Sequence, residues 1–159
     1  MKQLALIFLM SFMPFVHAFA QEKESDEKEI LELIESKQFK FTARSVTPLS
    51  GSTINLTSTY DLVVDSAEVE AWLPFYGRAY QTDYGSTEGG IKFKEKVKVF
   101  DVEVNEKKET YIVRIEADTT RDSYKIIIHT GKSGYGSMSI TSNRRQSVSY
   151  YGIIEALEE

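Results

Sequence analysis

The chain has 159 residues, no cysteine and a formal net charge of -5 at pH 7, from 24 acidic and 19 basic residues. This length is typical of one domain, and without cysteines the stability must come from a packed core and not from disulfides. The acidic balance is unsuited to phosphate backbones, which require clustered lysines and arginines, so we expect no nucleic-acid partner.

The N-terminus has the pattern of a secretory signal peptide. Lys2 precedes an apolar run over residues 4–15, and Ala18-Phe19-Ala20 provides an A-x-A cleavage signature. The run is shorter than the roughly 20 apolar residues that a membrane span needs. We therefore expect residues 1–20 to be removed. Because no cysteine is available for a lipid anchor, we expect a soluble protein of the periplasm or cell exterior that is not a lipoprotein.

The mature chain is predicted to begin with a short helix over residues 25–37. Ser25 can act as the N-cap, and Asp26 places a negative charge in the first turn. Ile30, Leu31 and Ile34 form a short apolar stripe at helical spacing. A helix of this length is marginal alone, so we expect it to pack on the sheet of its own domain.

From Phe39 onward, apolar and polar residues alternate with a period of two, which is typical of half-buried strands. Residues 67–73 are ambiguous because they include good helix formers, but their alternation favours a strand paired back on residues 60–64. A change of phase within residues 95–100 predicts a bulge. The predicted strands cover residues 39–44, 54–64, 67–73, 91–104, 111–117, 124–129, 137–141 and 147–154.

Short links and the lack of interleaved helices predict an all-β, mainly antiparallel fold over residues 21–159. We expect about eight strands in one domain, with the short helix at its N-terminus. The pattern leaves a sandwich and a partly closed barrel as alternatives.

Motifs for catalysis are poorly represented. His129 is the only histidine after residue 20, and no G-x-S-x-G turn is present. The sequence His-Thr-Gly-Lys-Ser-Gly from His129 lacks the earlier glycine of a phosphate loop, because Ile126 stands there. We predict no catalytic residue, metal site or cofactor. A carboxylate-based hydrolase is kept as an alternative function, because the acids Glu88, Asp118 and Asp122 lie in or beside predicted loops.

The segment LPFYGRAYQTDYGSTEGGIKF, residues 73–93, contains the longest predicted connection, at residues 75–90. Its aromatic residues either close one end of the sheet or line a binding site. In the second interpretation, aromatic faces and arginine side chains suit a sugar, a carboxylate or a protein surface. The predicted ligand-binding residues are Tyr76, Arg78, Tyr80, Tyr84, Arg121, Asn143 and Arg145.

Several blocks of the sequence resemble a family of exported proteins from Bacteroidetes-type bacteria, the family labelled domain of unknown function 4251. The blocks are SKQFKFTARSVTPLSGSTINLTSTYDL, LPFYGRAY, TEGGIKF and SITSNRRQSVSYYG, and the resemblance spans roughly residues 35–154. It implies an envelope or secreted protein and supplies no activity, cofactor or catalytic residue. Many relatives look lipid-anchored, a feature that this cysteine-free chain does not share.

Two short segments, Asp65-Ser66-Ala67 and Asp118-Thr119-Thr120, resemble O-glycan acceptors in exported proteins of those bacteria. Both fall in predicted turns, so Ser66 and Thr119 are candidate modification sites. The leading functional prediction is a non-enzymatic binding or accessory protein whose partner is an unknown small ligand or envelope protein. A structural subunit of an envelope assembly and the hydrolase are the alternatives.

Overall fold

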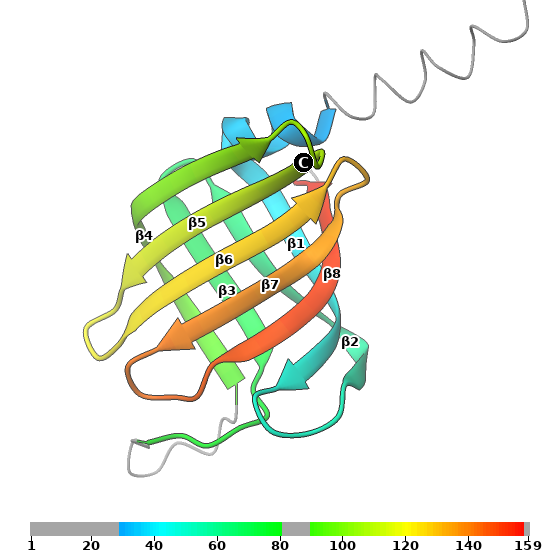
Figure 1. Cartoon of the computed structure of the whole chain (residues 1–159). Helices are drawn as coiled ribbons and strands as arrows, with labels where there is room; N and C mark the ends of the chain where they lie inside the picture. Colours follow the sequence, from blue (N-terminus) through cyan, green and yellow to red (C-terminus); the bar gives the residue numbers. More distant parts are fainter. Residues whose placement is uncertain (1–28, 81–89, 158–159) are drawn as a thin grey trace, which may run out of the picture.

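The computed structural model describes residues 29–80 and 90–157, which form an antiparallel β-barrel with a short helix over residues 29–36 at one end (Figure 1). The predicted signal peptide and the expected helix start at Ser25 lie outside the described residues. The strands in this part of the chain are β1 (Gln38–Pro48), β2 (Ile54–Asp65), β3 (Glu68–Pro74), β4 (Gly90–Asn105), β5 (Thr110–Asp118), β6 (Ser123–Gly131), β7 (Tyr135–Ser142) and β8 (Val148–Ala156).

Each strand pairs with the next along the chain, and β1 pairs with β8 to close the barrel. This closing ladder runs from Phe39 opposite Ala156 to Pro48 opposite Val148. Closure decides between the two predicted architectures in favour of the barrel, because every strand gains hydrogen-bonding neighbours on both sides. The all-β prediction with one short helix is confirmed.

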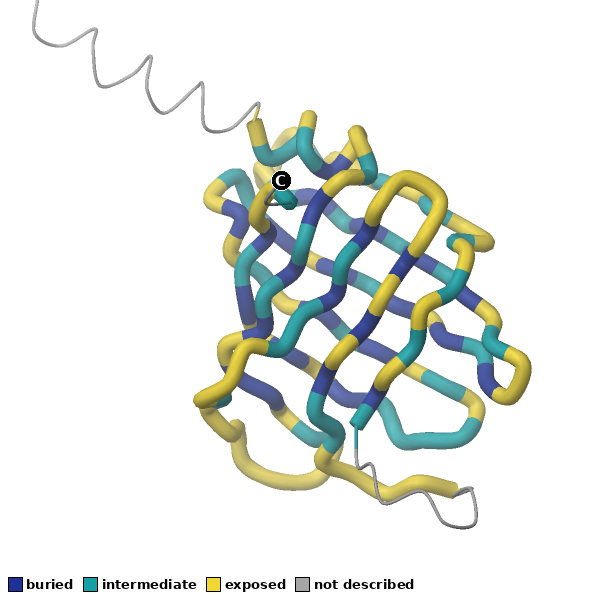
Figure 2. Tube along the Cα trace, turned by 180° about the vertical axis from the view of Figure 1, so that it is seen from behind, coloured by how far each residue is buried: buried dark blue, intermediate teal, exposed yellow. Residues whose placement is uncertain are grey.

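The core follows from the alternation of side chains along the strands. Phe39, Phe41 and Ala43 of β1 are buried, and their side chains therefore face the interior. Figure 2 shows buried positions recurring along the strands. Ile34 of the helix is fully buried among them, so the helix covers one end of the barrel. Each buried aliphatic or aromatic side chain contributes about 1.5–3 kcal/mol, which is how a barrel without disulfides is stabilised.

Two local predictions about the strands are confirmed. Residues 68–74 form a strand, paired with β2 after a tight turn in which Ser66 has a φ of 56°. The register of β4 and β5 shifts between Val97 and Val99, which is the predicted bulge.

The expectation that all of β2 is half-buried is wrong for its first part. Ile54 keeps 37% of its surface exposed, and residues 57–59 are exposed. The reason is the pairing with β1. Ser45 lies opposite Asn55 and Ala43 lies opposite Tyr60, so residues 56–59 of β2 bulge out of the ladder. Leu56 packs only partly against the core.

The loops that follow β1, β3, β5 and β7 lie at the end of the barrel away from the helix (Figure 1). We call this the loop end. No helix within residues 29–80 or 90–157 is long and apolar enough to cross a membrane.

Candidate functional site

Residues 75–80, which we call the crossing segment, extend from β3 across the loop end (Figure 1). The amide of Tyr80 donates to the carbonyl of Arg144 at 2.7 Å, and the amide of Gln146 donates to the carbonyl of Arg78 at 3.1 Å. Ala79 and Arg145 form an isolated antiparallel bridge. The β7–β8 loop lies four strands away from the β3–β4 connection in either direction around the barrel. The crossing segment therefore spans the opening.

Arg145 holds this arrangement in place. Its Nη1 donates to the carbonyl of Gly90 at 2.6 Å, and its guanidinium lies 5.3 Å from the centre of the Phe75 ring. Charge-assisted hydrogen bonds and cation–π contacts of this kind are among the stronger polar interactions. The side chain that we predicted to bind a ligand thus joins the β7–β8 loop to both ends of the β3–β4 connection.

Tyrosines fill the barrel below the crossing segment. The hydroxyl of Tyr150 donates to the carbonyl of Pro74 at 2.8 Å, and the rings of Phe93 and Tyr124 stack with centres 4.3 Å apart. Burial raises the pKa of Tyr150 well above its ordinary value. Burial, and then the charge of Asp122, also raise the pKa of Tyr124. This end of the barrel interior is packed.

The Tyr150 hydroxyl provides a pH-dependent prediction. An unfolded chain releases a tyrosine proton near pH 10, whereas folded Tyr150 keeps its proton at higher pH. The contribution of Tyr150 to stability is therefore complete below about pH 10 and falls as the pH rises above it. In the Tyr150→Phe variant we expect a shallower alkaline loss of stability than in the wild type, because this group no longer titrates.

The same substitution removes the hydrogen bond to Pro74. At neutral pH we expect it to cost about 1 kcal/mol. Thermal unfolding of the wild type and of Tyr150→Phe, from about pH 8 to about pH 11, measures how steeply the stability of each protein falls. The contributions of exposed lysines are the same in both proteins, so they cancel when the two curves are compared. Parallel alkaline curves for the two proteins would contradict the assignment.

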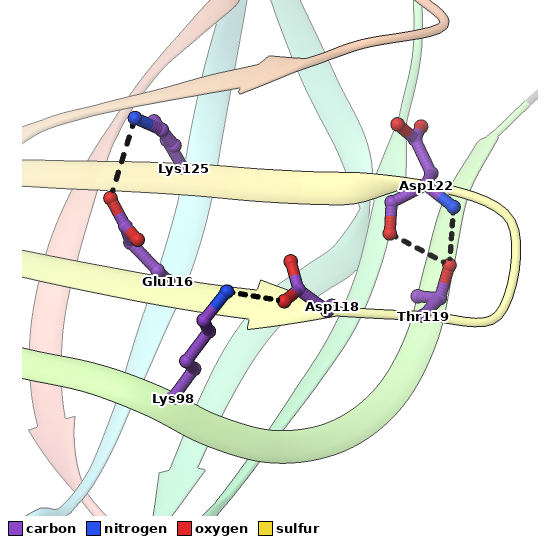
Figure 3. Close-up of polar contacts among 6 residues, drawn as sticks. All are labelled: Lys98, Glu116, Asp118, Thr119, Asp122 and Lys125. Carbon is purple, nitrogen blue, oxygen red and sulfur yellow. Dashed lines mark hydrogen bonds and ion pairs between the residues drawn. The ribbon is translucent and has the colours of Figure 1, made fainter.

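Two loop acids considered for hydrolysis are engaged in other interactions (Figure 3). The carboxylate of Asp118 pairs with Lys98 at 2.7 Å, and this pairing lowers the pKa of Asp118. Asp122 is buried, and its Oδ1 accepts the amides of Ser123 at 2.9 Å and Asn143 at 3.0 Å. Asp122 therefore ties the β5–β6 loop to the β7–β8 loop. The third acid, Glu88, lies outside the described residues.

A groove of about 310 Å³ opens on the barrel wall at the loop end. It lies where β2 and β3 separate, since their pairing stops at Asp61 opposite Trp72. Leu73 and Pro74 then pair with β4. Its lining consists of Tyr60, Trp72, Leu73, Pro74, Phe75, Tyr76, Gly90 and Lys92.

Trp72 is the largest exposed side chain of this groove, with 52% of its surface accessible. It stands directly opposite Lys92 in the β3–β4 ladder, and the Lys92 ammonium lies 4.0 Å from the centre of the tryptophan ring. A cation at this distance is attracted by the face of the ring. The groove thus combines aromatic surface with positive charge on two paired strands.

The structure brings the described part of the predicted site to the loop end, but not into one cavity. Tyr76 is 43% exposed and lines the groove, while Tyr80 is 64% exposed on the crossing segment near Arg78. The other predicted residues there are Arg121, Asn143 and Arg145, on the neighbouring loops. Tyr84 lies outside the described residues. The aromatic stretch is thus divided, with Phe75 partly buried and the two tyrosines exposed.

Sequence reasoning missed Tyr60, Trp72 and Lys92 as groove residues. One signal was available: Val69, Ala71 and Leu73 are the inward positions of a strand, so Trp72 had to point outward. A tryptophan on the solvent side of a strand is a large apolar surface that needs a contact. Its partner Lys92 could not be identified, because strand register is set by pairing.

The two candidate O-glycan acceptors have different surroundings. Ser66 is exposed at the tip of the β2–β3 turn, and its Oγ contacts only the neighbouring carboxylate of Asp65 among the bonds described, at 3.1 Å. The Thr119 hydroxyl donates to the carbonyl of Asp122 at 3.0 Å and accepts the Asp122 amide at 2.8 Å (Figure 3). A glycan on Thr119 would remove the donated bond. Both sites stay predictions, with Ser66 the more accessible.

Metal ligands do not cluster in the described part of the chain, where no group of three histidine, cysteine, aspartate or glutamate residues could hold an ion. His129 is exposed on the outer face of β6.

The fold and the site define a class of protein: a closed, up-and-down antiparallel barrel, packed inside, with a lateral aromatic groove at one end. A family model described as domain of unknown function (DUF4251) matches residues 21–154, and the chain belongs to this family. The fold is similar to the crystal structure of a DUF4251 family protein from Bacteroides eggerthii, with a TM-score of 0.65 and 16% identity over 83% of this chain and 88% of that chain. No curated protein matches the chain.

Proposed function

We propose that the chain is a non-enzymatic binding protein of the bacterial periplasm or cell exterior, and that the groove between β2 and β3 is its ligand site. The observation that carries this proposal is the groove itself, in which Trp72, Tyr76 and Lys92 converge. Its volume of about 310 Å³ is at the small end of the range for small-molecule sites. The export pattern of residues 1–20 supports the location.

The lining favours a small ligand with a flat apolar face. Trp72 and Tyr76 present aromatic surface, and the Lys92 ammonium adds positive charge beside the indole. Such a combination suits a ring that carries a carboxylate or several hydroxyls. Because β3 and β4 hold Trp72 and Lys92 opposite each other, the backbone that carries both side chains is already in place before binding. A binding role is also consistent with the engagement of Asp118 and Asp122 in structural contacts.

Trp72 is the only tryptophan in the chain, so its fluorescence reports on the groove alone. We expect protein isolated from its own host to carry a bound species in native mass spectra. Adding the released species back should change the Trp72 emission. In the Trp72→Ala variant we expect the species to be retained at least about tenfold more weakly, as for a central aromatic contact.

The control is Val104→Ala, which removes an exposed apolar side chain, 43% accessible, from the end of β4 that lies outside the groove. This variant should retain the species with wild-type affinity. A bound species that is retained equally by both variants would rule out the groove as its site.

A further inference from the structure

Charge is distributed unevenly around the outside of the barrel. Adjacent strands from β3 to β6 are joined across their outer faces by ion pairs. These are Lys94 with Glu70 at 3.2 Å, Arg114 with Glu103 at 2.8 Å and with Asp101 at 3.1 Å, Lys98 with Asp118 at 2.7 Å, and Lys125 with Glu116 at 3.5 Å. This part of the wall has the composition of an ordinary solvated surface.

The wall formed by β7 and β8 is different. Their one charged residue is Glu155, next to the last residue of β8, and residues 135–142 and 146–154 contain none, in a chain that is 27% charged. The two strands lie side by side in the near wall of Figure 1. Within the uncharged part of the two strands, the side chains that alternate with the buried ones, and so face outward, are Tyr135, Ser137, Ser139, Thr141, Ser149, Tyr151 and Ile153. All of them except Ile153, which stands opposite Tyr135, have a hydroxyl group.

Two tyrosines and one arginine form a platform on this hydroxyl-rich wall. The rings of Tyr135 and Tyr151 are nearly parallel, with an angle of 18° and centres 6.4 Å apart. The Arg44 guanidinium lies 5.1 Å from the centre of the Tyr135 ring. Tyr135 and Tyr151 nevertheless keep 39% and 52% of their surfaces exposed. The platform is held in place and remains accessible.

We propose that the β7–β8 wall is a second binding site, and that it takes a chain of neutral sugars. Serine, threonine and tyrosine hydroxyls both donate and accept hydrogen bonds, as do the hydroxyls of a sugar. The tyrosine rings offer flat surfaces for the apolar faces of pyranose rings. The wall shares no strand with the groove: β7 is four strands from β3, and β1 separates β8 from β2.

The chemistry of this wall is less suited to other ligands. An anionic polymer would require clustered cations, and Arg44 is the one charge in the platform. The buried centre of a protein interface is depleted in serine and enriched in large apolar residues, whereas Ser137, Ser139 and Ser149 lie in the middle of this wall. A polyhydroxylated chain is the partner whose groups match both the serines and the tyrosines.

Native gel electrophoresis of residues 21–159 through gels that contain a dissolved polysaccharide tests the proposal. Laminarin, xyloglucan and soluble starch are the neutral polymers, and sodium alginate is the charged comparison. We expect at least one neutral polymer to retard the wild type. Tyr151→Ala and Tyr135→Ala should each weaken the retardation about tenfold, as expected for an aromatic contact at the centre of a site. Trp72→Ala should leave it unchanged, so this result is independent of the groove.

Thermal unfolding of each variant shows whether it is folded, and both tyrosines are exposed, so we expect wild-type midpoints. Retardation by alginate alone would overturn the proposal, as would no retardation by any of the polymers. Sedimentation velocity completes the test. A dimer that dissociates in Tyr151→Ala would show that the wall binds a second copy of the chain, which also overturns it.

Discussion

Replacing Gly152 with alanine is expected to lower the free energy of unfolding by about 3 kcal/mol, the upper part of the range for inserting a methyl group into a packed site. Gly152 lies in β8, where the ladder to β1 closes the barrel. An alanine Cβ there would overlap the carbonyl oxygen of Thr42 and lie 2.9 Å from the Phe41 ring. The ring can rotate, but the carbonyl belongs to the neighbouring strand, so the alanine would push the closing strands apart.

Urea denaturation of the wild type and of Gly152→Ala measures this cost. For a protein of this size the loss corresponds to a fall of roughly 10 °C in the unfolding midpoint. Gly131→Ala is the matched control, because the nearest atom to its Cβ is the Glu109 carbonyl oxygen at an ordinary 3.8 Å. Equal stabilities for the two variants would show that β1 and β8 are not packed as closely as described.

The Arg145→Ala variant is expected to lose about 2 kcal/mol of stability and to release the crossing segment. The substitution removes a charge-assisted hydrogen bond to the Gly90 carbonyl and the contact with the Phe75 ring. Arg145→Lys should recover only part of the loss, since an ammonium group cannot reproduce the planar contact with the ring.

Amide hydrogen exchange locates this effect. The amides of Tyr80 and Gln146 are hydrogen-bonded between the crossing segment and the β7–β8 loop, so they should exchange faster in Arg145→Ala than in the wild type. Arg78→Ala is the control, because the Arg78 side chain is exposed while its backbone carbonyl accepts the Gln146 bond. If protection falls equally in both variants, Arg145 does not hold the segment in place.

These contacts divide the aromatic stretch between structure and recognition. Phe75, together with Arg145, closes the loop end of the barrel, whereas Tyr76 turns outward and completes the groove. The groove depends on this closure, because Phe75 and Gly90, the two residues that Arg145 contacts, are both part of its lining. We therefore expect substitutions of Arg145 to weaken ligand binding in the groove indirectly, because Arg145 itself is not part of the groove lining.

Local patterns in the sequence were sufficient for the elements. The alternation of Val69, Ala71 and Leu73 with exposed neighbours identified β3, and the phase change near Val97 identified a bulge, because burial on one face leaves a period of two in the sequence. The stripe that includes Ile34 identified the helix in the same way. These features depend on neighbours a few residues apart, and so does the all-β class.

Only the tertiary structure decided how those elements close and where a ligand can enter. The β1–β8 ladder, the Arg145 bond to Gly90 and the Trp72 contact with Lys92 all join residues far apart in the chain. Their geometry depends on the register of strands, which side-chain alternation alone does not determine. The groove lies where β2 leaves β3 at Asp61, directly after the bulged part of the β1–β2 pairing, and no local pattern in the sequence records either feature.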